Sequence, residues 1–118
     1  PLRDGVLDQC MELGVTPLAW SPIAGGRLGQ ERSTAAGLPE GKRLVDLMDV
    51  LDRVAAEQGA SRVTVALAWL LAHPAGVIPI IGTQRLERIS ESTKALEVTL
   101  DRATWNQILV AAQGEPLP

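Results

Sequence analysis

Apolar residues recur at helical spacing over much of the chain and predict most of its structure. The clearest pattern covers residues 43–57 and ends at Gly59, and a shorter one covers residues 2–13 and stops at Gly14. In the longer pattern the apolar residues follow i, i+3, i+4, i+7 spacing: Leu44, Leu47, Met48, Leu51, Val54 and Ala55. Both stretches are therefore predicted to be helices, each with its apolar residues on one face.

Two further helices carry recognisable caps. Ser61 precedes a helix over 62–72 that is apolar on nearly every side, and this helix is expected to be buried. Asp101 caps the last helix, which Gly114 and Pro116 close.

Two short apolar runs, 15–20 and 77–81, lie between helices and predict strands. Pro17 interrupts the first run, because proline cannot donate a hydrogen bond to a strand ladder. A glycine-rich loop over 21–42 follows the first strand, and connections of this length usually serve a function or lack order. A helix over about 86–96 follows the second strand.

The order helix, strand, helix, helix, strand, helix, helix predicts parallel strands joined by helical crossovers. Two strands alone do not make a stable sheet, and apolar strands of this kind require neighbours at both edges. The chain is therefore predicted to be part of a larger α/β domain.

The composition is that of an ordinary globular protein, with 118 residues, 46% hydrophobic and 21% charged. Its net charge of −3 lacks the basic excess of a general nucleic-acid binder, so no nucleic-acid partner is expected. Several cations nevertheless fall in or just beyond the two strand-to-helix segments: Arg27, Arg32, Lys42, Arg43, Arg85 and Arg88. Local positive potential there would suit a small anionic ligand.

A single cysteine, Cys10, cannot form an intrachain disulfide, so a reducing, cytoplasmic compartment is the simplest interpretation. No apolar run reaches the ~18 residues that a membrane span needs, and no membrane partner is expected. The chain starts at Pro1 and opens directly on a helical pattern, as a piece of a longer protein would.

The segment 77–92 carries the most specific chemistry. It reads as an apolar strand, a Gly-Thr-Gln turn at 82–84, and a helix that carries Arg88. A small-residue turn after a buried strand, with a cation just inside the next helix, is suited to hold a phosphate. Since the chain has one His and no Tyr, it is predicted to hold a ligand whose chemistry is performed by other residues.

Several motifs, in this order, resemble the C-terminal part of aldo-keto reductases. They are Ala19-Trp20-Ser21-Pro22, Gly25-Gly26-Arg27-Leu28, Val65-Ala66-Leu67-Ala68-Trp69-Leu70-Leu71 and Ile78-Pro79-Ile80-Ile81-Gly82-Thr83. The resemblance covers essentially the whole chain. It implies that residues 1–118 are the C-terminal part of one α/β domain, the last third of a (β/α)₈ TIM barrel. This part holds strands seven and eight with their flanking helices and is incomplete alone.

The resemblance places a cofactor at the C-terminal ends of the two strands. After strand seven, Ser21, Ile23 and Gly25 would contact the pyrophosphate through backbone N–H groups and a hydroxyl. Arg27 either bridges to the pyrophosphate or is a solvated charge. Trp20 either stacks on the nicotinamide or fills the barrel interior.

After strand eight the resemblance implies a site for the adenosine 2′-phosphate and the adenine, made by Gly82, Thr83, Gln84, Arg88, Glu91 and Ser92. Thr83 and Gln84 would offer donors, and the Arg88 guanidinium matches a dianionic phosphate. Many members carry a basic residue in place of Gly82 and an Asn in place of Ser92. Arg88 nevertheless favours NADP(H) as the cofactor.

The resemblance implies an oxidoreductase that reduces aldehydes or ketones by hydride transfer, with a small-molecule carbonyl substrate in the complete enzyme. The family's catalytic Tyr, Lys, Asp and His lie on the first half of the barrel, so no catalytic residue and no metal ligand is assigned here. The isolated chain is expected to be inactive and to need the N-terminal barrel part or self-association.

Two other interpretations stay open. The chain is alternatively a non-catalytic nucleotide-binding or assembly module that pairs with a complementary chain, or a structural remnant that binds nothing. Among single residues, His73 is expected to be structural, Trp69 and Trp105 to lie in the core, and Arg32 and Lys42 to be surface charges.

Overall fold

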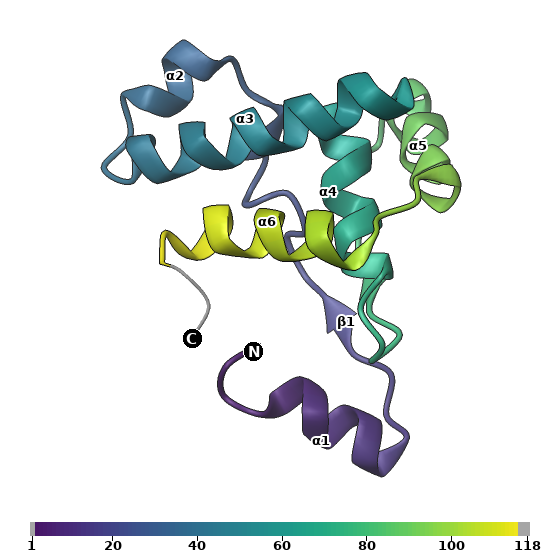
Figure 1. Cartoon of the computed structure of the whole chain (residues 1–118). Coiled ribbons are helices and arrows are strands. Elements are labelled where there is room, and N and C mark those ends of the chain that lie inside the picture. Colours follow the sequence, from purple (N-terminus) through teal and green to yellow (C-terminus); the bar gives the residue numbers. More distant parts are fainter. Residues whose placement is uncertain (1, 116–118) are drawn as a thin grey trace.

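The computed structural model describes residues 2–115, and Pro116, expected to close the last helix, lies outside them. The strand β1 lies between most of the helices and α1, which stands at the opposite end (Figure 1), and β2 pairs with β1. In chain order the elements are α1 (Val6–Leu13), β1 (Leu18–Ala19), η1 (Arg27–Gly29), α2 (Arg32–Ala36), α3 (Gly41–Gln58), α4 (Arg62–Leu71), β2 (Ile78–Pro79), α5 (Leu86–Thr93), η2 (Lys94–Glu97) and α6 (Arg102–Gln113). The predicted alternation of helices and strands is thus confirmed.

The helix caps form as the sequence predicts. The Ser61 hydroxyl accepts a hydrogen bond from the Thr64 N–H (3.2 Å), and the Asp101 carboxylate accepts one from the Thr104 N–H (2.7 Å). These bonds satisfy backbone donors that have no partner within the first turn of a helix. The helices expected to stop at glycine also do so, with left-handed backbone at Gly14, Gly59 and Gly114.

The strands are parallel neighbours, as predicted, but much shorter than the apolar runs that contain them. Leu18 lies opposite Ile78 in the register. The Ile78 N–H donates to the Pro17 carbonyl (3.0 Å), and the Ile80 N–H donates to the Ala19 carbonyl (2.9 Å). The pairing stops early because each strand has one partner and the prolines supply no N–H.

Segment 21–42, expected to be one long loop, contains the helices η1 and α2. Five residues are too few for an amphipathic pattern, so the sequence gives no signal for α2. A tertiary contact holds it instead, since Ala35 is completely buried against α3. At Gly41 an added Cβ would lie 2.4 Å from the Ala36 carbonyl oxygen, so only glycine allows the helices to come this close. The helix expected over 86–96 likewise ends at Thr93 and tightens into η2.

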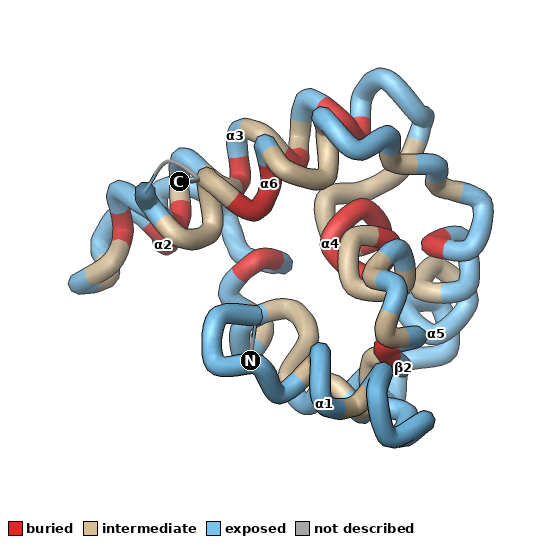
Figure 2. The backbone as a smooth tube through the Cα atoms, turned by 60° about the horizontal axis from the view of Figure 1, so that its bottom comes forward, coloured by how far each residue is buried: buried red, intermediate tan, exposed pale blue. Residues whose placement is uncertain are grey.

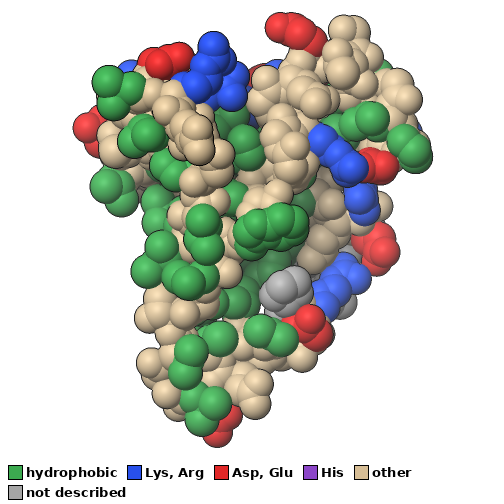
Figure 3. Space-filling model, turned by 180° about the vertical axis from the view of Figure 1, so that it is seen from behind, with side chains coloured by type: hydrophobic (Ala, Val, Ile, Leu, Met, Phe, Trp, Pro, Cys, Tyr) green, Lys and Arg blue, Asp and Glu red, His purple; other side chains and the backbone are tan. Residues whose placement is uncertain are grey.

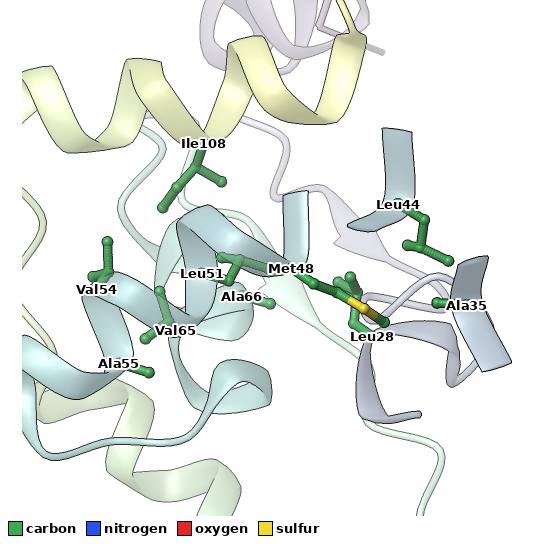
Figure 4. Close-up of a cluster of buried hydrophobic side chains, with 10 residues drawn as sticks. All are labelled: Leu28, Ala35, Leu44, Met48, Leu51, Val54, Ala55, Val65, Ala66 and Ile108. Atoms are coloured by element: carbon green, nitrogen blue, oxygen red, sulfur yellow. The ribbon is translucent and has the colours of Figure 1, made fainter. Parts of the chain in front are cut away.

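The core lies among α2, α3, α4 and α6 and is closed by η1. Its buried side chains are Leu28, Ala35, Leu44, Met48, Leu51, Val54, Ala55, Val65, Ala66 and Ile108. Figure 4 shows Met48 reaching from α3 toward Leu28. By contrast α1 has no buried residue and carries no red segment in Figure 2.

Two tryptophans join α4 to α6. The rings of Trp69 and Trp105 stack with centroids 4.7 Å apart, and each indole N–H donates to the other's carbonyl at 3.0 Å. The His73 ring lies 5.9 Å from that of Trp105, and its Nδ1 accepts from the Ala75 N–H (3.1 Å). His73 and Trp69 thus have structural contacts, with Trp69 packed against the core, whereas Trp105 is half-buried and lies outside the core clusters.

Candidate functional site

The two strands bring their C-terminal ends to the same edge because they run parallel. Trp20, after β1, and Ile81, after β2, line one open cavity of about 990 Å³. That volume lies at the upper end of the roughly 300–1,000 Å³ that ligand sites occupy. Of the predicted site residues, all except Arg27 line this cavity: Trp20, Ser21, Ile23, Gly25, Gly82, Thr83, Gln84, Arg88, Glu91 and Ser92.

The loop after β1 forms one wall of the cavity and turns sharply at its start. Ser21 adopts a left-handed backbone (φ 54°), and Gly25 and Gly26 follow at φ 65° and 88°. The Ser21 hydroxyl accepts a hydrogen bond from the Gly25 N–H (2.8 Å). The Gly25 amide, expected to face a phosphate, is therefore already bonded within the loop. Within residues 2–115 the Ile23 N–H, by contrast, donates to no hydrogen-bond acceptor.

The turn after β2 forms the opposite wall. The Thr83 hydroxyl accepts from the Arg85 N–H (3.2 Å), and this bond orders the approach to α5. A Cβ built at Gly82 meets nothing within 4 Å, so the backbone there faces open space. A ligand can approach this turn without steric hindrance.

Helix α5 contributes one face to the cavity. Arg88 is exposed and has no ion-pair partner within the part of the chain that the structure describes, while Glu91 lies half-buried. The Ser92 hydroxyl donates to the Arg88 carbonyl (2.8 Å), so it is engaged with its own helix. Of these side chains, the Arg88 guanidinium is the one free to take a new anionic partner.

Four of the other five cations named from the sequence, all except Arg43, are paired with carboxylates. Arg27 is paired with Glu40 rather than aimed into the cavity, which is why it is missing from the lining. The remaining pairs join Arg32 to Asp49, Lys42 to Asp46 (2.9 Å) and Arg85 to Glu87 (3.5 Å). Carboxylates thus offset most of this charge locally, and Arg32 and Lys42 are the surface charges expected of them.

Trp20 is the most exposed large apolar side chain described, at 85%. It stands beside the cavity and packs into no core of this chain. A flat aromatic face is therefore available to a ligand or to another part of a larger protein.

The strand ends Pro22 and Ile81 line the cavity as expected, but sequence reasoning missed part of the lining: Gly26, Gly29, Gln30, Val63, Leu67 and Ile80. Val63 and Leu67 lie four residues apart on α4, so helical periodicity could have placed them on the face toward the strands. Gln30 carried no such signal, because only the fold of the loop brings it to the cavity.

Within residues 2–115, no group of three or more His, Cys, Asp and Glu side chains is placed to hold a metal ion. His73 lies at a second, apolar cavity of about 270 Å³ between α1 and α4. None of the helices described combines the length and apolar character that a membrane crossing requires.

Comparisons with known proteins agree on one family. The family model described as "Aldo/keto reductase family" matches residues 3–112. The chain is 50% identical over 123 residues to the 6-dehydroglucose reductase of Novosphingobium aromaticivorans, covering 100% of this chain and 38% of that protein. A more distant relative is the aldo-keto reductase yakc [NADP(+)] of Schizosaccharomyces pombe, 27% identical over 124 residues, with 93% of this chain and 36% of the relative covered.

A solved structure gives the same result. The crystal structure of the thermostable aldo-keto reductase Tm1743 with the inhibitor epalrestat matches 96% of this chain and 34% of its own. The TM-score is 0.69 and the sequence identity 30%. The chain thus spans about a third of the length of the relatives it matches.

Proposed function

This chain belongs to the aldo/keto reductase family, and on that premise we propose that it is the part of an NADP(H)-dependent oxidoreductase that binds the cofactor. We assign residues 1–118 to the C-terminal part of the barrel, with β1 and β2 as strands seven and eight. The observation that carries the proposal is the shared cavity of about 990 Å³ at the ends of the two parallel strands.

The residues present fit a phosphate-bearing cofactor. Arg88 supplies a guanidinium that is not already paired, and Gly82 leaves room for close approach. Thr83 and Gln84 line the cavity beside them with polar side chains. Arg88 would hold the 2′-phosphate as a forked donor, because a planar guanidinium matches phosphate oxygens in pairs. The named yakc relative, an NADP(+) protein, supports this choice of cofactor.

When bound, NADPH supplies the hydride that reduces a carbonyl group. This chain's part is to bind and orient the cofactor, since it has no Tyr to act as the proton donor of the family. The carbonyl substrate belongs to the complete protein. The first compound to test there is 6-dehydroglucose, because the relative that is 50% identical is named 6-dehydroglucose reductase. A reducing, cytoplasmic setting, consistent with the lone Cys10, is part of the proposal.

The test is a titration of this chain with NADPH and NADH. Replacing Arg88 by Ala should weaken NADPH binding by about 1.5–3 kcal/mol, or roughly 10- to 150-fold, because hydrogen bonds to a charged phosphate are lost. NADH binding should not change. Arg85→Ala is the matched control, because Arg85 is a neighbouring cation that pairs with Glu87 outside the cavity. Equal losses in the two variants, or no NADPH binding at all, would contradict the proposal.

A second candidate function, an assembly module, is favoured by the uncovered strands. Leu18 is 63% exposed and its register partner Ile78 is 50% exposed. Seen from behind, hydrophobic side chains extend from the end where α1 lies up the middle of the molecule (Figure 3). Unpaired strand edges of this kind invite another chain, either the complementary barrel part or a second copy.

Sedimentation of the chain tests this second function. If the strands are covered by association, the wild-type chain should sediment as a concentration-dependent oligomer, and Ile78→Lys should shift it toward the monomer. Leu96→Lys is the matched control, because Leu96 is 77% exposed but lies on η2. A wild-type chain that stays monomeric and folded at every concentration contradicts self-association.

A further inference from the structure

Arg62, at the start of α4, joins the cavity's loop wall to helix α3. Its Nε and Nη2 donate to the two carboxylate oxygens of Asp52, each at 2.7 Å. Its Nη1 donates to two loop carbonyls, those of Leu28 (3.2 Å) and Gln30 (3.0 Å). Only 18% of the side chain is exposed, so these bonds are shielded from solvent.

Elsewhere the loop is held by the ion pair between Arg27 and Glu40 and by the packing of Ile23 against the core. Leu28 is buried in the core, and a Cβ at Gly29 would only touch Val63 at 3.8 Å. Gly29 and Gln30 line the cavity, whereas Arg62 itself does not. The Arg62 bonds therefore act on the far end of the wall without entering the cavity.

We propose that Arg62 is a positioning residue for cofactor binding: it anchors the loop from Ser21 to Gln30 in the shape that accepts the pyrophosphate. The inference rests on the proposed function and extends it to a residue with no place in the cavity. It follows from one side chain bonding Asp52 on α3 and two loop carbonyls at the same time.

Only arginine can perform this task. A planar guanidinium donates to a carboxylate in a fork while a further N–H points elsewhere, and a lysine ammonium has no such fixed geometry. The hydrogen bond to Asp52 also raises the pKa of Arg62, so the charge persists at any relevant pH. Arg62→Lys therefore keeps the charge and removes the anchor.

The experiment compares Arg62→Lys with Arg53→Lys in this chain. Arg53, on α3, is a matched control, because it donates hydrogen bonds to the side chains of Glu57 and Gln107 but touches no part of the loop. Without ligand, hydrogen exchange of the amides at 26–30 should become about tenfold faster in Arg62→Lys while exchange in α3 stays unchanged. Arg53→Lys should leave both rates as in the wild type.

Two nucleotides then separate positioning from general damage. NADPH carries the pyrophosphate, and adenosine 2′-monophosphate lacks it. Arg62→Lys should weaken NADPH binding about tenfold, the effect of one lost hydrogen bond, and leave adenosine 2′-monophosphate binding unchanged. Arg88→Ala should weaken both.

Each outcome decides the proposal. Unchanged loop exchange in Arg62→Lys, or equal weakening of the two nucleotides, overturns it. If the wild type binds neither nucleotide, the proposed function fails, and loop exchange alone then shows whether Arg62 anchors the wall. Should Arg62→Lys not fold, Asp52→Asn weakens the same fork while keeping Arg62, and the same readings apply to it.

Discussion

Two regions of the molecule differ in how many of their apolar residues the chain itself buries. The helical region consists of α2, α3, α4 and α6, and the strand region consists of α1, β1 and β2. In the helical region, apolar faces meet one another and bury a core that includes Met48 and Leu51. In the strand region, equally apolar residues stay exposed, and α1 buries none. The cavity lies where the two regions meet, with walls from both.

The difference shows that an apolar pattern predicts burial only where a partner surface exists. The strand region is joined to α6 by Arg3, whose guanidinium donates to the Gln113 side chain (2.7 Å), but exposed bonds of this kind contribute little stability. We infer that the helical region stabilises this chain, while the strand region depends on a neighbour.

The largest expected difference in stability comes from replacing a methionine by alanine in each region. Met48 is fully buried in α3, and Met11 in α1 is 43% exposed. Met48→Ala should lower the free energy of unfolding by about 2–5 kcal/mol, because it leaves a cavity in the core. Met11→Ala should change it by about 0.5 kcal/mol or less. Urea denaturation measures both, and comparable losses would erase the distinction between the regions.

Glycine substitutions sharpen the comparison. Gly41→Ala should destabilise the chain by about 1–3 kcal/mol, since the new methyl group meets the backbone of α2. Gly82→Ala, at the end of β2, has free space and a permitted backbone, so thermal melts should show no loss of stability. A loss at Gly82 as large as that at Gly41 would mean that the strand end is more tightly packed than the structure shows.

Tryptophan variants probe a smaller difference. Trp105→Phe removes the bond to the Trp69 carbonyl and should cost about 0.5–1.5 kcal/mol. Trp20→Phe should cost nothing measurable, because Trp20 is 85% exposed. Fluorescence provides a check, since Trp20 should be quenched readily by iodide and the stacked pair should not. Equal quenching of all three would contradict the structure.

The smallest effect is a pH dependence of two aspartates, Asp101 at the N-cap of α6 and Asp4 just before α1. Hydrogen bonds, chiefly from the Thr104 N–H, lower the pKa of Asp101 below its ordinary value of 3.8. The Val6 N–H similarly lowers the pKa of Asp4 before α1. A lowered folded-state pKa stabilises the chain above the ordinary pKa, and this contribution is lost as the pH falls through the lowered value.

Acid should therefore act differently in the two regions. Protonation of Asp101 should lower the melting temperature of the whole core, whereas protonation of Asp4 should loosen only α1. Hydrogen exchange followed from about pH 5 downward measures both effects. Asp101→Asn, which caps without titrating, should flatten the core's acid dependence, and an unchanged slope would show that other carboxylates control it.

Much of the fold follows from local patterns in the sequence. The 3.6-residue spacing from Leu44 to Ala55 identified α3, Ser61 and Asp101 marked the starts of α4 and α6, and the two apolar runs located the parallel strands. These signals are local, because caps and amphipathic faces depend on residues within a few positions of one another. The turn at 82–84 and Arg88, which line the cavity, could also be found this way, because they lie within a few residues of one another after the second apolar run.

Only the tertiary structure decided the remainder. Helix α2 is held because it packs closely against α3 at Gly41. Arg27 does not line the cavity because the fold places Glu40 where the two side chains form an ion pair. Gln30 and the Arg62 anchor belong to the site through contacts between residues about thirty positions apart. Contacts at that separation depend on how the elements pack, and no pattern within a single segment encodes them.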